Sequence, residues 1–278
     1  MAARRVLGLD DSARPEAVEP GQGEAQRKGF PMTISARDVP HDMADRLIVA
    51  LDVESVAAAA AMAERLDGVV SFFKIGLWLL FAPGVDRLID TLIGRGKKVF
   101  LDAKMFDIPQ TVNKGIAEAA RRGVSFITVH GDDAIMRAAV QGRGASDLKI
   151  FAVTVLTSLD DAALHAMGYS LGARDLVRKR AASAVACGCD GIIASAEDNP
   201  DEIRHAAQGP GLLIATPGIR QAQGSVNDHK RLATPREAIR HGADYLIVGR
   251  PIVEAADPPA AAHNFVRDME EAWALLPA

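Results

Sequence analysis

The sequence predicts an α/β fold of the (β/α)8 TIM barrel type, and three observations support this prediction. Eight short apolar runs alternate with longer segments rich in alanine, arginine and glutamate, a pattern typical of strands and amphipathic helices. The repeats fill about 230 residues, a common length for a closed barrel. Polar residues follow most of the apolar runs, where a barrel carries its catalytic groups. An open doubly wound sheet is the alternative, but no glycine fingerprint follows the first run.

The elements follow in order along the chain. The strands are expected at Leu47–Leu51, Ser71–Ile75, Lys98–Leu101, Phe126–Val129, Lys149–Val155, Gly191–Ala194, Leu212–Ala215 and Tyr245–Val248. Helical segments between and after them include Val56–Leu66, Thr111–Arg122, Arg174–Ala186, Pro235–His241 and a last helix, Ile252–Leu275. Glycines that are expected to cap helices are Gly68, Gly96, Gly123, Gly188 and Gly242.

The beginning of the chain differs from the rest. Residues 13–24 contain turn formers and charges but no apolar period. We therefore expect residues 1–41 to form a disordered N-terminal arm and residues 42–278 to form a single catalytic barrel domain.

Composition argues against several classes of protein. A net charge of −4 and a pI of about 6.0 give no electrostatic reason to expect nucleic acid or an anionic membrane as partner. No apolar stretch reaches the ~18 residues of a membrane span. The N-terminus lacks the apolar core of a secretory signal, so we expect a cytoplasmic protein. Cys187 and Cys189 are one residue apart, which suits buried thiols better than a disulfide framework or a zinc site.

The most informative segment is Asp102-Ala-Lys-Met-Phe-Asp-Ile-Pro-Gln-Thr111, at the end of the third apolar run. Side chains two residues apart in a strand share a face, so Asp102 and Lys104 should point the same way. Charges inside a protein are costly unless they are paired, which favours an active site here. Taken alone, the residues leave two other interpretations open. Asp102 and Lys104 could form a surface pair, and Asp107 could cap a helix that starts near Pro109.

Polar groups also end other predicted strands. They include Asp52, Lys74, His130, Thr154, Thr157, Ser158, Arg220 and Arg250. Because phosphate commonly binds after strands 7 and 8 of a barrel, we expect Arg220, Gly249 and Arg250 to hold an anion, with solvated loop arginines as the alternative. The polar segment Gln221–His229 suits a lid over a ligand, or an idle surface loop. His130 is expected to be a hydrogen-bonded wall residue rather than a metal ligand or catalyst.

Together these motifs resemble the orotidine 5′-phosphate decarboxylase family of the bacterial type. The resemblance runs in order from about Arg46 to Leu276, and its most specific part is the D-x-K-x-x-D-I-P segment. The other matching segments are Leu51-Asp52, Phe73–Gly76, Val153–Ser158, Thr216–Arg220 and Val248–Pro251. The resemblance implies a cofactor-free barrel that forms a homodimer. It also implies conversion of orotidine 5′-phosphate to UMP, the last step of de novo pyrimidine synthesis.

The resemblance also implies roles for the matching residues. Lys74, Asp102, Lys104 and Asp107 would form a charged catalytic network, with Asp107 and Ile108 reaching into the active site of the partner. The substrate-binding residues would be Asp52 and the neighbouring chain's Thr111 at the ribose, Thr157 or Ser158 at the pyrimidine, and Arg220, Gly249 and Arg250 at the phosphate. His229 stands in the lid where bacterial members often carry a glutamine that contacts phosphate, and a histidine can donate a hydrogen bond there, so His229 would also bind the phosphate.

Decarboxylation at C6 leaves charge on a vinylic carbon that the ring π-system does not stabilise. The sequence shows no metal-binding cluster or cofactor motif, so we expect a metal- and cofactor-independent reaction in which Lys104 stabilises that charge and protonates C6. One rival is a metal-dependent sugar-phosphate enzyme of the same barrel superfamily, a ketogulonate-phosphate decarboxylase or a hexulose-phosphate synthase. The others are a class I aldolase with Lys74 or Lys104 as Schiff base and a non-catalytic phosphate sensor.

Overall fold

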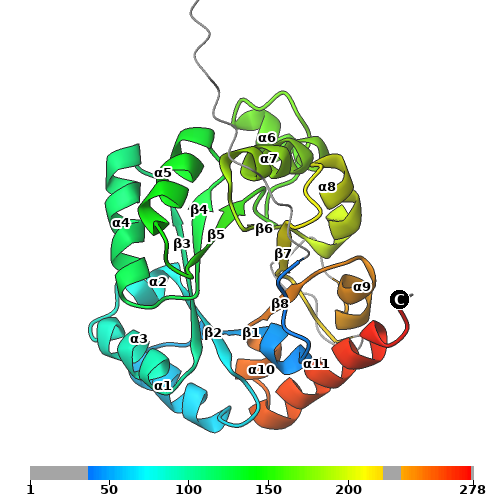
Figure 1. The fold of residues 1–278 in the computed structure, drawn as a ribbon. Helices are drawn as coiled ribbons and strands as arrows, with labels where there is room; N and C mark the ends of the chain where they lie inside the picture. Colours follow the sequence, from blue (N-terminus) through cyan, green and yellow to red (C-terminus); the bar gives the residue numbers. More distant parts are fainter. Residues whose placement is uncertain (1–36, 222–232, 277–278) are drawn as a thin grey trace, which may run out of the picture. The chain divides into compact units, whose positions relative to one another are not determined.

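The computed structural model describes residues 37–221 and 233–276. In this part of the chain, eight parallel strands form a closed barrel in sequence order, and β8 pairs with β1 to complete it. The strands are β1 (Leu47–Ala50), β2 (Phe72–Gly76), β3 (Lys98–Met105), β4 (Phe126–His130), β5 (Lys149–Val153), β6 (Gly191–Ile193), β7 (Leu213–Thr216) and β8 (Tyr245–Val248). Figure 1 shows the barrel surrounded by helices. The predicted (β/α)8 barrel is confirmed.

The helices connect successive strands around the outside of the barrel. They are α1 (Val56–Arg65), α2 (Leu77–Leu80), α3 (Val85–Gly94), α4 (Pro109–Arg121), α5 (Asp133–Arg143), α6 (Asp161–Ala166), α7 (Ala173–Cys187), α8 (Pro200–Ala206), α9 (Pro235–Arg240), α10 (Arg250–Val253) and α11 (Pro258–Trp273), with the 3-10 turns η1 (Met43–Arg46) and η2 (Ala196–Asp198). Within the described ranges, no helix has the length and apolar character that crossing a bilayer requires.

One helix prediction is wrong. The single helix expected over Ile252–Leu275 is two helices, α10 and α11. Asp257 begins the second one, because its side chain accepts a hydrogen bond from the backbone N–H of Ala260. Pro258 follows in the first turn, where its missing N–H has no cost, whereas inside a continuous helix it would remove a hydrogen bond. The five predicted capping glycines all have positive φ, as expected.

Aromatic rings fill the interior of the barrel near the amino-terminal ends of the strands. Phe126 of β4 lies 4.8 Å from Phe72, 4.5 Å from Phe151 and 5.1 Å from Tyr245, measured between ring centroids. Gly191 of β6 makes room for this cluster, since a Cβ at that position would lie 2.5 Å from Cε1 of Phe151. This packed layer fills the amino-terminal half of the barrel interior. A site inside the barrel therefore opens at the carboxyl ends of the strands.

Buried charges hold the opposite, amino-terminal end together. Asp244, at the start of β8, is fully buried and accepts hydrogen bonds from the Ile214 N–H at 2.8 Å, from Arg37 at 3.1 Å and from Arg204. Arg46 donates to the backbone carbonyl of Asp244 at 2.6 Å. Of the predicted arm, only residues 37–41 belong to the described residues. The contact of Arg37 with Asp244 joins these residues to the barrel.

Candidate active site

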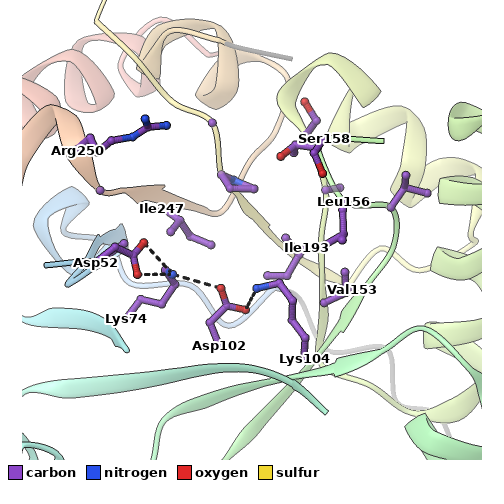
Figure 2. A pocket seen from close by; sticks show the side chains of 18 of the residues that line it. Asp52, Lys74, Asp102, Lys104, Val153, Leu156, Ser158, Ile193, Ile247 and Arg250 are labelled. Carbon is purple, nitrogen blue, oxygen red and sulfur yellow. Dashed lines mark hydrogen bonds and ion pairs between the residues drawn. The ribbon is translucent and has the colours of Figure 1, made fainter. Parts of the chain in front are cut away.

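A cavity of about 530 Å³ opens at the carboxyl ends of the strands. Nine of the predicted site residues line it: Asp52, Lys74, Asp102, Lys104, Thr157, Ser158, Arg220, Gly249 and Arg250. They come from β2 and β3, from the segments after β1, β5, β7 and β8, and from the start of α10. Figure 2 shows the charged side chains and the apolar residues Val153, Ile193 and Ile247 facing the same space. The cavity therefore combines charged and apolar walls, as a site for an organic anion requires.

Four charged side chains of alternating sign form a row along one side of the cavity (Figure 2). The Lys74 Nζ lies 3.4 Å from the Asp52 carboxylate and 3.3 Å from Oδ2 of Asp102. The Lys104 Nζ lies 2.7 Å from Oδ1 of the same Asp102. Lys74 is buried, so its charge depends on these two carboxylates in place of water. We call the four side chains the charge row.

Asp102 is the central acid of the charge row. Burial alone would raise the pKa of its carboxyl group, but the nearby ammonium groups of Lys74 and Lys104 act in the opposite direction. Hydrogen bonds from Lys104 and from the Thr128 hydroxyl add to their effect, so the pKa of Asp102 lies below its ordinary value. Asp102 therefore remains a carboxylate across the neutral range.

The backbone of β3 departs from a regular strand where it carries these groups. Its pairing with β4 shifts register between Leu101 and Met105, and Lys104 has a φ of 45°. A residue other than glycine seldom adopts such a left-handed conformation, and it marks local strain. Asp102 and Lys104 do meet in the cavity, as predicted. They meet across an irregular segment, however, and not through the simple alternation of a strand.

Gly76, at the end of β2, allows Asp52 and Lys74 to approach each other. A Cβ placed on Gly76 would lie 2.5 Å from Oδ1 of Asp52 and 3.4 Å from the Lys74 Nζ. The φ of Gly76 is −77°, so an alanine is not excluded by its backbone conformation and only the side-chain clash matters.

The Gly76→Ala variant is therefore expected to push the Asp52 carboxylate away from Lys74 while the barrel still folds. We expect KM for orotidine 5′-phosphate, the substrate that the resemblance implies, to rise by about tenfold, since one good polar contact is worth roughly 1.4 kcal/mol. Steady-state kinetics, with Gly94→Ala as control, would measure this. Gly94 ends α3, and a Cβ there meets nothing within 4 Å. Equal KM values for both variants would contradict the assignment of Gly76.

Two arginines, Arg220 and Arg250, also line the cavity. Burial, and next the positive charge of Arg250, lower the pKa of Arg220. Two guanidinium groups that repel each other at one wall are stabilised when an anion binds between them. Gly249 lies beside them, and its Cα is close enough to Ala50 that a Cβ would lie 3.4 Å from the Ala50 Cβ. This wall is a candidate phosphate site.

Three residues of the site, Ser195, Glu254 and Thr128, were not among the predicted ones. Ser195 lines the cavity and directly follows the sixth apolar run, so the strand-end rule could have found it. Glu254 follows Arg250 by one helical turn and also lines the cavity. Thr128 is fully buried within the fourth apolar run. Its only signal in the sequence is that a polar residue interrupts that run.

Three predicted residues, Asp107, Ile108 and Thr111, do not line the cavity of their own chain. All three are exposed, and Oδ1 of Asp107 accepts the backbone N–H of Ile108 at 2.6 Å. Ile108 occupies the position before α4, so Asp107 does not cap that helix in the usual way. His229, and the predicted lid apart from Gln221, lie outside the described residues.

His130 stands at the end of β4 but does not line the cavity. Its ring packs against that of Phe106, with 4.6 Å between centroids, and its buried Nδ1 has no hydrogen-bond partner among the described residues. Burial and the charge of Arg180 lower the pKa of His130, so the ring is neutral at pH 7. Across residues 37–221 and 233–276, no three His, Cys, Asp or Glu side chains form a group that could hold a metal ion. The metal-free reaction stays a prediction.

A family model and two similar proteins indicate the same family. Residues 45–265 match the family described as "Orotidine 5'-phosphate decarboxylase / HUMPS family". The orotidine 5′-phosphate decarboxylase of Rhodopseudomonas palustris (strain BisA53) is 51% identical over 232 residues, which cover 83% of this chain and 97% of the relative. The enzyme of that name from Afipia carboxidovorans is 50% identical over 230 residues, or 83% and 97% of the two chains.

A solved structure agrees with these sequences. The crystal structure of orotidine 5′-phosphate decarboxylase from Lactobacillus acidophilus superposes with a TM-score of 0.71 at 33% sequence identity, covering 81% of this chain and 99% of that one. The segment that matches the family, residues 45–265, contains β1 to β8 and all four residues of the charge row. The chain therefore belongs to the orotidine 5′-phosphate decarboxylase / HUMPS family.

Proposed function

We propose that this protein decarboxylates orotidine 5′-phosphate to UMP in pyrimidine biosynthesis, without a metal or cofactor. The observation that carries the proposal is the charge row, which lies in one cavity with a pair of arginines. Relatives that are 51% and 50% identical and bear the name of this enzyme support the choice of substrate.

Lys104 is the proposed proton donor. When the bond between C6 and the carboxylate breaks, CO2 leaves and its bonding electron pair remains on C6. The Lys104 ammonium stabilises that charge and transfers a proton to C6, which yields UMP and a neutral amine that regains a proton from water. The 2.7 Å contact with Asp102 supports this role, because it holds the ammonium group in one place before the substrate binds.

The remaining charges are proposed to prepare the site. Asp102 would lie next to the departing carboxylate, where like-charge contact raises the energy of the bound substrate. Lys74 lies between Asp52 and Asp102 and offsets the negative charge of the two carboxylates. Asp107 would complete the network from the neighbouring chain.

Binding of the nucleotide is assigned to groups away from C6. Arg220, Gly249 and Arg250 would bind the phosphate, and Asp52 the ribose. Thr157 or Ser158 would contact the pyrimidine. Contacts far from the reacting carbon can contribute binding energy that is expressed in the transition state.

A homodimer is proposed in which Asp107, Ile108 and Thr111 complete the site of the partner. Their exposure supports this arrangement, because Ile108 and its neighbour Phe106 are 65% and 67% exposed although both are large and apolar. Partner contact would bury these side chains and bring a third acid to the charge row.

The direct test is to mix the purified protein with orotidine 5′-phosphate and EDTA and to follow the loss of orotate absorbance in the ultraviolet. We expect full turnover in the presence of the chelator, with UMP and CO2 formed in equal amounts. The control replaces the substrate with free orotate, which lacks the phosphate that the two arginines would bind.

Each rival would give a different result. Activity on a sugar phosphate that EDTA abolishes would favour a metal-dependent relative. Covalent trapping of substrate on a lysine by borohydride would favour an aldolase. Tight binding of orotidine 5′-phosphate with no turnover would favour a sensor.

A further inference from the structure

Thr128 of β4 makes two hydrogen bonds to residues of the charge row. The residue is fully buried. Its hydroxyl donates to Oδ1 of Asp102 at 2.9 Å and accepts the backbone N–H of Lys104, also at 2.9 Å. One side chain on β4 thus contacts both of the charge-row residues that lie on β3.

The irregular pairing of β3 with β4 explains why a side chain is needed there. Leu101 pairs with Ile127 and Met105 with Val129, so three residues of β3 stand opposite Thr128 alone. Such a bulge leaves ladder groups without their usual backbone partners. The Lys104 N–H is one of these groups, and the Thr128 hydroxyl takes the place of a backbone acceptor.

The chemistry of the hydroxyl matters as much as its position. A hydroxyl can donate one hydrogen bond and accept another at the same time, which an aliphatic side chain cannot do. The hydroxyl donates to Oδ1 of Asp102, the same oxygen that lies 2.7 Å from the Lys104 Nζ. Thr128, Asp102 and Lys104 therefore form a closed set of contacts, which fixes the carboxylate and both ends of the lysine.

We propose that Thr128 is a positioning residue, whose hydroxyl orients the Asp102 carboxylate and holds Lys104 in its left-handed conformation so that the ammonium group points at the reacting carbon. The proposal deepens the decarboxylase function proposed above and rests on it. Thr128 does not line the cavity, so it acts through its two neighbours and not on the substrate.

The test compares Thr128→Val, which keeps the shape and removes the hydroxyl, with Thr128→Ser, which keeps the hydroxyl and removes a methyl group. We expect Thr128→Val to lose about 10- to 100-fold in kcat, since hydrogen bonds to charged groups contribute roughly 1.5–3 kcal/mol, with little change in KM. Thr128→Ser should retain kcat within about threefold, although it loses packing as well. Thr128→Cys, with a weak hydrogen-bonding thiol, should fall between them.

A titration separates positioning from a general loss of stability. Without the Thr128 hydrogen bond, the pKa of Asp102 should rise in Thr128→Val, and the acidic limb of the kcat profile should move to higher pH. Carbon-13 NMR of the Asp102 carboxyl group should show the same shift directly, and Thr128→Ser should titrate like the wild type. If Thr128→Val does not fold, the comparison of Thr128→Cys with Thr128→Ser answers the same question.

The possible outcomes distinguish this inference from the proposed function. Unchanged kcat and an unchanged Asp102 titration in the folded hydroxyl-free variant would overturn the role of Thr128 while leaving the decarboxylase intact. A wild-type protein that does not turn over orotidine 5′-phosphate would overturn the function. The NMR titration would then still decide whether Thr128 controls Asp102.

Discussion

The Lys104→Ala variant is expected to fold normally and to lose decarboxylation almost completely. The change removes both the proposed proton donor and the positive charge proposed to lie nearest to C6, and each such group typically contributes about 10²-fold or more to the rate. We therefore expect kcat to fall by at least about 10⁴-fold. Little stability should be lost, because the Lys104 side chain is 36% exposed and Asp102 keeps Lys74 as a partner.

Turnover with orotidine 5′-phosphate, together with the thermal unfolding midpoint, would measure both effects. Lys179→Ala is the matched control, because Lys179 is an exposed lysine of α7 and does not line the cavity. Turnover of Lys104→Ala within tenfold of the wild type would rule out Lys104 as the proton donor. An inactive but unfolded variant would be resolved by Lys104→Met, which keeps the aliphatic length and removes the charge.

The largest effect on stability is expected at the other end of the barrel, from Asp244→Ala. The Asp244 carboxylate accepts hydrogen bonds from Arg37, Arg204 and a backbone N–H. The substitution removes this carboxylate and leaves the buried Arg204 guanidinium without it. Breaking a buried ion pair from one side commonly costs about 3–5 kcal/mol of unfolding free energy. Asp201 still contacts Arg204 but is largely exposed, so it compensates only in part.

Urea denaturation would show this loss as a lower midpoint. The activity of each folded molecule should not change, because Asp244 lies at the amino-terminal end of β8 and the cavity at the carboxyl ends. Asp90→Ala, which removes an exposed ion pair with Arg122, is the control and should change stability little. If both variants unfold at the same urea concentration, the buried network does not stabilise the barrel as argued.

The sequence allowed the barrel to be predicted because each strand is a local apolar run and each helix has its own period. The strand that begins at Tyr245 and ends at Val248 has the predicted bounds. The break before α11 was missed although Asp257 and Pro258 carry the signal, because the helical period was extended across them.

The site was predictable only to the level of strand ends. Asp52, Lys74, Asp102 and Lys104 were named because of their place in the sequence, and they do line one cavity. The left-handed Lys104 could not be foreseen, because the register shift arises from pairing with β4 and no glycine marks it. The role proposed for Asp107 depends on a second chain, and the pattern of one chain does not show such a contact.

The alternating order of the charge row has a consequence for mutagenesis. Since each ammonium group lies within 3.4 Å of a carboxylate, removing one charge of the row leaves its neighbours without part of their counter-charge. The effect of a single substitution then reflects the four groups jointly and not one residue. For the same reason, combined substitutions within the row should depart from the sum of their separate effects, and double-mutant cycles will be needed to apportion the coupling.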